Sequence, residues 1–259
     1  MTRTAPPAPT VETGTERYVY GVVRADDGSD AVTDLAGATG EVVAVVVHGE
    51  LAAVVEAIPD AEAVPAARFV RAHARVLDAV AARCSVLPLR FGTVVASDEA
   101  VVEELLAPDR DHLVDALEQL DGHVQLLLRA RYVLDTVLAE VVAEHPQVRA
   151  LRARTRDLPD DAAMPERVRL GELVSQAIET KRAADREAML AALQPHARRW
   201  SVRPSGGLDG LLDLAVLVDE HGVADFEAHA QAAAAQMAGR ADLELIGPMA
   251  PYDFASDGV

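Results

Sequence analysis

The segment Val86–Val95 reads VLPLRFGTVV and lies between two helical patterns. Its apolar residues predict a strand, but Pro88, Arg90 and Gly92 interrupt the pattern. Proline cannot donate a hydrogen bond to a β-ladder, so within sheets it is confined to edge strands and bulges. An arginine between apolar residues is costly to bury without a partner. Because such departures from local rules are typical of functional or strained sites, two interpretations stay open: a kinked edge strand with an exposed Arg90, and a functional segment.

The residues that precede this segment predict three strands. Alternating and continuous apolar runs place them at residues 18–24, 41–48 and 51–57. The two residues Gly49-Glu50 are short enough to link the second and third strands as a tight hairpin. Residues 26–30, DDGSD, predict a loop.

A helix with one apolar stripe is expected after these strands, with Pro65 in its first turn. The residues of the stripe recur at three- and four-residue steps and are Phe69, His73, Val76, Leu77, Val80 and Cys84. A histidine on such a stripe is more often a hydrogen-bonded core residue than a catalyst. Both roles are kept open for His73.

Two short helices should follow the segment before the first domain ends. Ser97 is a suitable N-cap, and Pro108 should break the helix so that Asp109 can cap a second piece. Asp121-Gly122 is a turn signal. We therefore expect a second domain to begin at residue 121.

The second half predicts the order strand, helical excursion, strand, strand, helix, strand. The strands are expected at residues 123–131, 197–203, 211–218 and 243–247, with the third central; helices are expected at 134–142, 166–193 and 223–237, and a polar loop at 156–165. This is the order of a ferredoxin-like split β-α-β unit, here with an inserted helical hairpin. The fold class is therefore α+β, with a disordered tail at 1–16, a mixed α+β domain at 17–120 and a modified ferredoxin-like domain at 121–255.

The composition excludes several classes of partner. The chain has 259 residues, half of them hydrophobic, and a net charge of −18. Such acidity argues against nucleic acid and anionic membranes as partners, since both require clusters of lysine and arginine. The single cysteine excludes an internal disulfide. There is no signal-peptide pattern and no apolar run long enough to span a bilayer, so we expect a cytoplasmic protein.

No catalytic or cofactor motif is present. The sequence lacks a phosphate-binding P-loop, a dinucleotide fingerprint, a nucleophile elbow and a zinc-protease helix. His221, Asp225 and His229 are the nearest approach to a metal site, but a solvated helix face explains them better. We therefore expect no cofactor, no metal and no enzymatic activity.

Four stretches together resemble the GvpF/GvpL family of gas-vesicle accessory proteins. They are YVYGVV at Tyr18–Val23, the helix with His73 and Val76-Leu77, VLPLRFGTVV at Val86–Val95 and GPMAPYDF at Gly247–Phe254. LDGHVQ at residues 120–125 is similar to the strand entry of that family, and the resemblance spans most of the chain after the tail. The sequence departs from the family pattern at three places: Met249-Ala250 where Trp-Pro is frequent, Gln125 where glutamate is common, and Leu126 where an aromatic residue often follows.

The resemblance implies a two-domain, non-enzymatic protein that takes part in assembling gas vesicles, the gas-filled, protein-walled compartments of some prokaryotes. It implies association with the small hydrophobic shell protein GvpA and with other accessory proteins, in the cytoplasm and at gas vesicles. An acidic carrier could cover the apolar face of GvpA and keep it soluble during nucleation.

Candidate structural or partner-contact residues lie in the interrupted segment, the preceding helix and the C-terminal stretch. They are His73, Arg90, Phe91, Gly92, Pro251, Tyr252 and Phe254. We expect Arg90 to be structural, meeting an acidic side chain or backbone carbonyls at a hinge between the domains, with Phe91 buried beside it. Two alternatives remain: an enzyme on a ferredoxin-like scaffold that uses His73 and Arg90, and a plain oligomeric scaffold joined through sheet edges.

Overall fold

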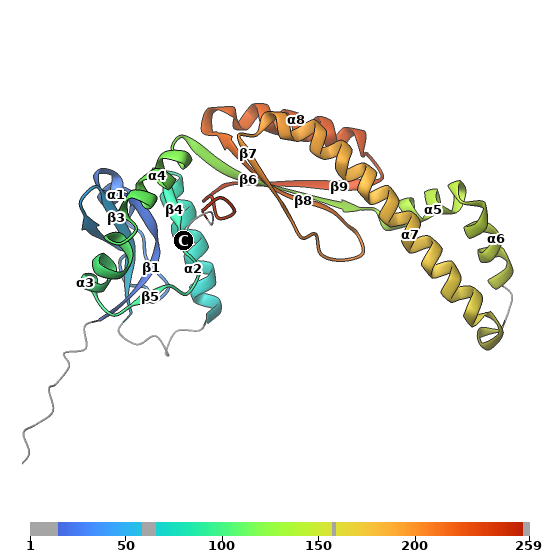
Figure 1. Ribbon diagram of the computed structural model, residues 1–259, viewed down its shortest axis with the longest axis horizontal. Coiled ribbons are helices and arrows are strands. Elements are labelled where there is room, and N and C mark those ends of the chain that lie inside the picture. Colours follow the sequence, from blue (N-terminus) through green and yellow to red (C-terminus); the bar gives the residue numbers. More distant parts are fainter. Residues whose placement is uncertain (1–14, 59–65, 157–158, 256–259) are drawn as a thin grey trace, which may run out of the picture. The chain divides into compact units, whose positions relative to one another are not determined.

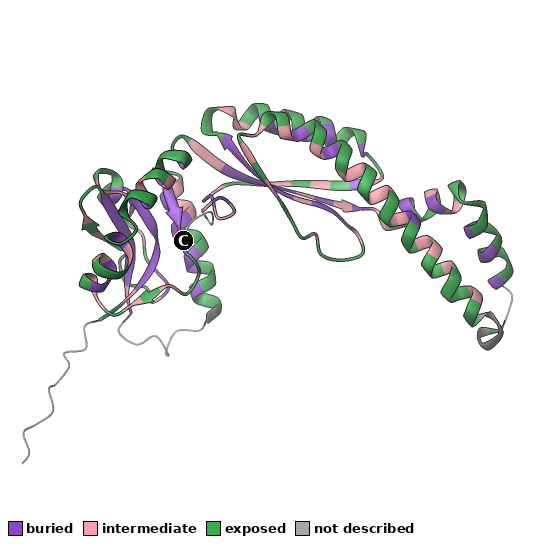
Figure 2. Ribbon diagram, in the orientation of Figure 1, coloured by how far each residue is buried: buried purple, intermediate pink, exposed green. Residues whose placement is uncertain are grey.

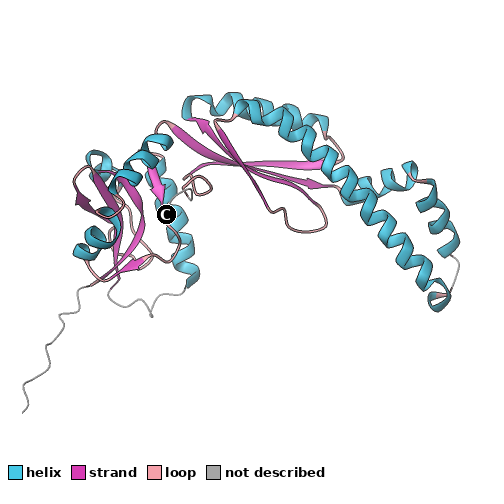
Figure 3. Cartoon of the chain, viewed as in Figure 1, coloured by secondary structure: helices cyan, strands magenta, loops and turns pink. Residues whose placement is uncertain are grey.

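The computed structural model describes residues 15–58, 66–156 and 159–255. The chain is an α+β protein with two antiparallel sheets, each in its own compact unit (Figures 1 and 3). The first unit contains the chain up to Gly122 together with the segment from Met249 onward, and the second contains His123–Pro248. The sequence-based domain limits had placed residues up to 255 in the second domain.

The first unit is built on one sheet. Its elements are β1 (Glu16–Arg24), α1 (Ala25–Ala31), β2 (Ala44–His48), β3 (Leu51–Ile58), α2 (Ala66–Ala81), β4 (Val86–Pro88), β5 (Val94–Val95), α3 (Asp98–Ala100), the π-helical η2 (Val101–Leu106) and α4 (Arg110–Leu120). The strands run in the order β2-β3-β1-β4, and β5 also pairs with β1.

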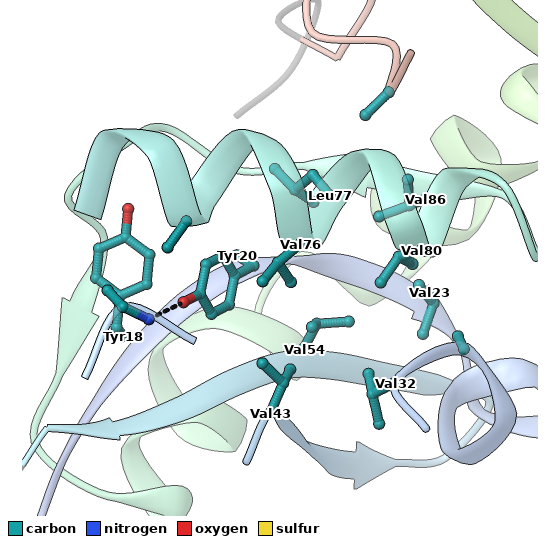
Figure 4. Close-up of a cluster of buried hydrophobic side chains, with 14 of the residues drawn as sticks. Tyr18, Tyr20, Val23, Val32, Val43, Val54, Val76, Leu77, Val80 and Val86 are labelled. Atoms are coloured by element: carbon teal, nitrogen blue, oxygen red, sulfur yellow. Dashed lines mark hydrogen bonds between the residues drawn. The ribbon is translucent and has the colours of Figure 1, made fainter. Parts of the chain in front are cut away.

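The sheet of the first unit is covered on both faces, so its strands are apolar along most of their length. Val76, Leu77 and Val80 of α2 pack in one core with β1 and β3, and Figure 4 shows Val76 and Val80 directed toward the strands. The other side chains of the sheet, at alternate positions, lie on the side where η2 contacts β2 and β3 and where α4 contacts β1 and β4.

Most elements of this unit agree with the sequence predictions. The strands, the β2–β3 hairpin around Gly49-Glu50 and the helix α2 are confirmed. Ser97 caps α3 by accepting a hydrogen bond from the Ala100 amide, whereas Asp109 stands at the N-cap position of α4 without a side-chain cap bond. Pro65 lies outside the described residues.

The loop expected at residues 26–30 is wrong, because α1 occupies this stretch. Asp26 and Asp27 lie in its first turn, where acidic side chains favour the positive end of the helix dipole. Gly28 is buried against the sheet: a Cβ added there would lie 3.2 Å from Ala52 Cβ and 3.4 Å from Val45 Cγ1. Tertiary packing therefore stabilises a helix whose sequence reads as a turn.

The second unit contains the predicted order of elements. These are β6 (His123–Tyr132), α5 (Leu134–Glu144), α6 (Pro146–Thr155), α7 (Asp160–Leu193), the 3-10 turn η3 (Gln194–His196), β7 (Arg199–Arg203), β8 (Gly210–Asp219), the 3-10 turn η4 (Glu220–Gly222), α8 (Val223–Gln236) and β9 (Ala241–Met249). The strand order is β7-β8-β6-β9, so β8 is central as predicted. The polar loop expected at 156–165 is wrong from residue 160 onward, where α7 begins with Pro165 inside it.

Helices cover one face of this second sheet. α7 and α8 contact each other and β8, and Phe226, Ala230 and Met189 pack against the strands. α7 continues past the sheet and packs there against α5 and α6 around Val141, Val148 and Ala177 (Figure 1). Figure 2 shows that β6 and β8 are buried along most of their length, whereas the helices expose one side.

Candidate functional site

The segment Val86–Val95 is an interrupted strand along one edge of β1. Its first half pairs Pro88 with Gly21, and its second half pairs Val94 with Tyr18. Between these pairs, the amide of Leu89 donates to the Tyr20 carbonyl at 3.0 Å, and the Val19 amide donates to the Thr93 carbonyl at 2.9 Å. The predicted kinked edge strand is therefore confirmed. Pro88 is the last residue of β4, directly before the interruption.

The interruption is a tight turn at Arg90–Gly92. The hydroxyl of Thr93 donates to the Arg90 carbonyl at 2.8 Å and closes the turn. Gly92 has a φ of +91°, a conformation that residues with a side chain rarely adopt. A Cβ at this position would meet nothing within 4 Å, so the backbone conformation, not crowding, requires the glycine.

Tyr18 and His73 hold this turn through hydrogen bonds on its inner side. The Gly92 amide donates to Tyr18 Oη at 3.3 Å, and Tyr18 Oη lies 3.0 Å from His73 Nδ1. Because the tyrosine oxygen accepts from Gly92, its proton can donate to the unprotonated nitrogen of a neutral imidazole. Burial lowers the pKa of His73, an effect that the nearby backbone carbonyl of Leu89 opposes, and so favours the neutral ring.

An aromatic cluster surrounds His73. Its ring centroid lies 5.7 Å from those of Tyr20 and Phe91, 5.8 Å from Tyr18 and 6.3 Å from Tyr252. Phe69 stacks on Tyr18 at 5.2 Å. The sequence has only nine aromatic residues, so the presence of five of them here makes this cluster the main aromatic feature of the molecule.

A cavity of about 370 Å³ opens beside the cluster. Its lining residues are mostly apolar and include His73, Arg90, Phe91, Tyr252, Val70, Ala74, Pro88, Leu89 and Ala255. Phe91 is 50% exposed and Val70 is 53% exposed. The cavity therefore has an apolar floor, two exposed apolar side chains at its rim and one guanidinium.

Four of the predicted residues meet at this cavity: His73, Arg90, Phe91 and Tyr252. The expectation that Phe91 is buried is wrong, because the turn exposes half of its surface and only its inner side meets Tyr18 and His73. Arg90 is exposed, and its predicted role at a hinge stays a prediction.

The C-terminal segment is held by α2. The amide of Ala250 donates to Asp78 Oδ1 at 3.0 Å, and burial raises the pKa of this carboxyl group. Pro251 and Phe254 are buried. Of the three residues predicted in this segment, Tyr252 is the one that lines the cavity.

The arrangement does not assemble a nucleophile with a base. Among the residues that the structure describes, no carboxylate lines the cavity, and His73 Nδ1 is engaged by Tyr18. Burial raises the pKa of the only cysteine, Cys84, to about 11, so its nucleophilic thiolate form is scarce at neutral pH. The chemistry available at the cavity is apolar contact, ring stacking and charge pairing through Arg90.

The residues described by the structure contain no group of three histidine, cysteine or acidic side chains that could hold a metal ion. His221 lies in η4, before α8 begins. His229 Nδ1 contacts the backbone carbonyl of Asp225 at 2.7 Å, and its ring stacks on His196 with a centroid distance of 3.4 Å.

Glu56 is a buried acidic residue that sequence reasoning missed. Its carboxyl group accepts hydrogen bonds from Tyr20 Oη at 2.6 Å, the Ala38 amide at 2.8 Å, the Thr39 amide at 2.6 Å and the Thr39 hydroxyl at 2.5 Å. It therefore anchors the loop that leads into β2. The sequence did contain a feature that points to this residue, because Glu56 is the single charged residue in the apolar run LAAVVEAI.

A family model described as "Gas vesicle synthesis protein GvpL/GvpF" matches residues 16–256. The chain belongs to the GvpL/GvpF family. It is 30% identical over 240 residues to gas vesicle protein F of Streptomyces sp. (strain CB03234), covering 92% of this chain and 98% of that one. Gas vesicle protein L of the same strain is also 30% identical, over 257 residues, covering 92% of each chain.

Solved structures of the family share the fold. Gas vesicle protein GvpF from Anabaena sp. PCC7120 superposes with a TM-score of 0.79 at 20% identity, covering 93% of this chain and 98% of the other. GvpF from Microcystis aeruginosa gives a TM-score of 0.73 at 21% identity, with 93% and 99% coverage. Membership of the family implies a role in gas vesicle formation. Within the described ranges, no helix has both the length and the apolar composition needed to cross a bilayer.

Proposed function

We propose that this GvpL/GvpF protein is a non-enzymatic accessory protein that binds the hydrophobic shell protein GvpA and keeps it soluble during nucleation of gas vesicles. The observation that carries the proposal is the cavity beside the Arg90–Gly92 turn, with exposed Phe91 and Val70 at its rim. Exposed apolar side chains beside a concave apolar surface are typical of protein-binding sites.

The turn suits this role because it presents Phe91 rigidly. Tyr18 and His73 hold the backbone on its inner side, so little conformational entropy remains to be lost when a partner binds. Phe91 can then act as an aromatic anchor while Arg90 supplies a polar rim contact.

The net charge supports a carrier role. A small apolar subunit tends to aggregate in water, whereas a chain with a net charge of −18 remains soluble through charge repulsion. A complex that hides the apolar surface of the subunit and exposes this acidic surface would resist precipitation. The same role requires the protein in the cytoplasm and at growing gas vesicles, together with other accessory proteins.

We also propose that the second unit is a modified ferredoxin-like domain with a helical hairpin insertion. The strand order β7-β8-β6-β9 supports this, because numbering the strands one to four along the chain gives the order 2-3-1-4 of a split β-α-β unit. The insertion corresponds to α5, α6 and the part of α7 that packs on them.

Co-expression of GvpA with the tagged protein, followed by pull-down, tests the proposed function. We expect GvpA to stay soluble and to co-purify, and Phe91→Ser to lower its recovery at least tenfold. The control is Leu208→Ser, which removes an apolar side chain that is 82% exposed in the second unit. Absence of GvpA with the unmodified protein would reject the carrier role, whereas full recovery with Phe91→Ser would reject the cavity as the contact.

A further inference from the structure

The outer edge of β2 is an unpaired sheet edge. Among the described residues, β2 is the terminal strand of the first sheet, and its one partner strand there is β3. The hairpin pairs His48 with Leu51 across the two-residue turn, so His48 and Leu51 exchange hydrogen bonds. Because hydrogen-bonded and non-hydrogen-bonded pairs alternate in an antiparallel ladder, Val45 and Val47 direct their amides and carbonyls away from β3.

The protein covers only the beginning of this edge. The Val43 amide donates to the Leu35 carbonyl at 2.9 Å, and the Gly37 amide donates to the Glu41 carbonyl at 2.9 Å. An isolated bridge between Ala36 and Val42 lies between these two bonds. In the part of the chain that the structure describes, no backbone hydrogen bond reaches the outward groups of Val45 and Val47. Each of these residues offers one donor and one acceptor.

The exposed part of β2 lacks the usual protection against strand pairing. Natural edge strands are protected against pairing by lysine or proline residues, by bulges or by being very short. Ala44–His48 reads AVVVH and contains none of these residues, and Val47 is 54% exposed. The opposite edge of the same sheet differs, because β4 and β5 are three and two residues long and β4 ends in Pro88.

Acidic residues flank this edge from both faces of the sheet. α1 and η2 both contact β2. Every charged residue within these two elements is acidic: Asp26, Asp27 and Asp30 in α1, and Glu103 and Glu104 in η2. A second copy of the chain would bring the same charges and a further net charge of −18. Self-pairing is therefore disfavoured, and an uncharged strand with basic flanks is favoured.

We propose that the outer edge of β2 binds an extended, apolar segment of another protein, flanked by lysine or arginine, which joins the sheet as an additional strand. Backbone hydrogen bonds to Val45 and Val47 supply the affinity, and the acidic flanks select the partner. This surface shares no residue with the cavity at Phe91, so the inference goes beyond the proposed function and does not depend on it.

A labelled synthetic peptide tests the proposal with the full-length protein. The probe is a fluorescein-labelled peptide of alternating valine and threonine with two lysines at each end, and its binding is followed by fluorescence anisotropy. Val45→Pro removes one outward amide without removing a bond of the β2–β3 ladder, and Val45→Thr keeps that amide as the matched control. We expect Val45→Pro to weaken binding at least tenfold and Val45→Thr to change it less than twofold.

Two further measurements keep the test decisive even where Val45→Pro fails to fold. Amide hydrogen exchange of the unmodified protein should slow at Val45 and Val47 when the peptide is added. A peptide with glutamate in place of lysine should bind at least tenfold more weakly at low salt. Protection at other residues only, equal binding of the acidic peptide, or a dimer in sedimentation that Val45→Pro dissociates would each overturn the proposal.

Discussion

Glu56 in the first unit and Arg240 in the second each hold several segments together, but their partners differ in kind. Glu56 is fully buried and accepts four hydrogen bonds from a tyrosine hydroxyl, two amides and a threonine hydroxyl. Arg240 is partly exposed and pairs with two carboxylates, Glu140 at 2.7 Å and Asp185 at 3.0 Å. Glu56 thus acts through buried hydrogen bonds, whereas Arg240 acts through ion pairs that reach solvent.

The network around Arg240, which lies in the turn between α8 and β9, joins three elements of the second unit: β6, α5 and α7. Asp185 of α7 also accepts from Tyr132 Oη at 2.5 Å, and Glu140 of α5 also pairs with Lys181 of α7 at 3.0 Å. Burial opposes ionisation of Glu140, but the hydrogen bonds from Arg240 and Lys181 outweigh it and lower the pKa of Glu140. The contribution of Arg240 should therefore depend on salt, whereas the contribution of the buried Glu56 should not.

The largest effect should come from Glu56→Ala. This change removes the carboxylate that accepts from the Tyr20 hydroxyl and from the amides of Ala38 and Thr39, at a cost of about 3 kcal/mol or more in the free energy of unfolding. Urea unfolding measures it, and hydrogen exchange should locate the loss in β1 and β3. The exposed Glu41→Ala is the control; equal losses for both variants would refute the role of Glu56.

Gly37→Ala provides an independent test of the same packing. A Cβ at Gly37 would lie 2.1 Å from Glu56 Cδ, which no side chain could tolerate without movement of the carboxyl group. We expect Gly37→Ala to lower the free energy of unfolding, as Glu56→Ala does. The effects of the two substitutions should not add in the double variant, because Glu56→Ala removes the carboxyl group with which the new Cβ clashes. Strict additivity of the two free energies would show that the two residues do not interact.

Arg240→Met should have the next largest effect. It keeps the apolar stem of the side chain but leaves Glu140 and Asp185 without this cation, which costs about 2 kcal/mol at low salt. Fluorescence of Trp200, the only tryptophan and part of the second unit, follows the transition. In 1 M NaCl we expect the loss in the free energy of unfolding caused by Arg240→Met to fall by about half, whereas the loss caused by Glu56→Ala should not change. An effect of Arg240→Met that is the same at both salt concentrations would contradict the difference drawn between Glu56 and Arg240.

His73 adds a pH dependence to the first unit. Its pKa is lowered by burial, so the unfolded chain binds a proton at a higher pH than the folded chain does. Stability should therefore fall as the pH drops below about 6.5, by about 1.4 kcal/mol for each unit between the two pKa values. His73→Gln should remove this slope when unfolding free energies at pH 7.5 and pH 5 are compared, and a slope that persists would exclude His73 as its source.

The sequence predicted the parts of the fold that depend on local patterns. The apolar runs located the strands, and Pro88 placed the interrupted segment at a sheet edge because proline removes a ladder donor. The loop predicted at residues 26–30 is wrong, because a helix forms there with Gly28 packed on Ala52 and Val45. That contact joins residues far apart in the sequence, so no local rule could reveal it.

The sequence predicted which residues form the candidate site, but not that the side chain of Phe91 is exposed there. His73, Arg90, Phe91 and Tyr252 were selected from the sequence, and they line one cavity. The exposure of Phe91 depends on the φ of Gly92 and on the bond from Gly92 to Tyr18, which only the folded chain defines. Glu56 was missed because its donors come from a loop and a strand about 17 to 36 residues away.

The smallest effect should come from Arg169, which tests the second unit's use of ion pairs. Arg169 and Glu172 lie three residues apart on α7 and pair at 3.2 Å, with both side chains about 60% exposed. Such exposed helical pairs contribute about 0.2–0.5 kcal/mol. Arg169→Ala should therefore shift the Trp200 unfolding transition far less than Arg240→Met does. A cost as large as that of Arg240→Met would mean that charge alone, and not the number and burial of carboxylate partners, sets the contribution of an arginine in this unit.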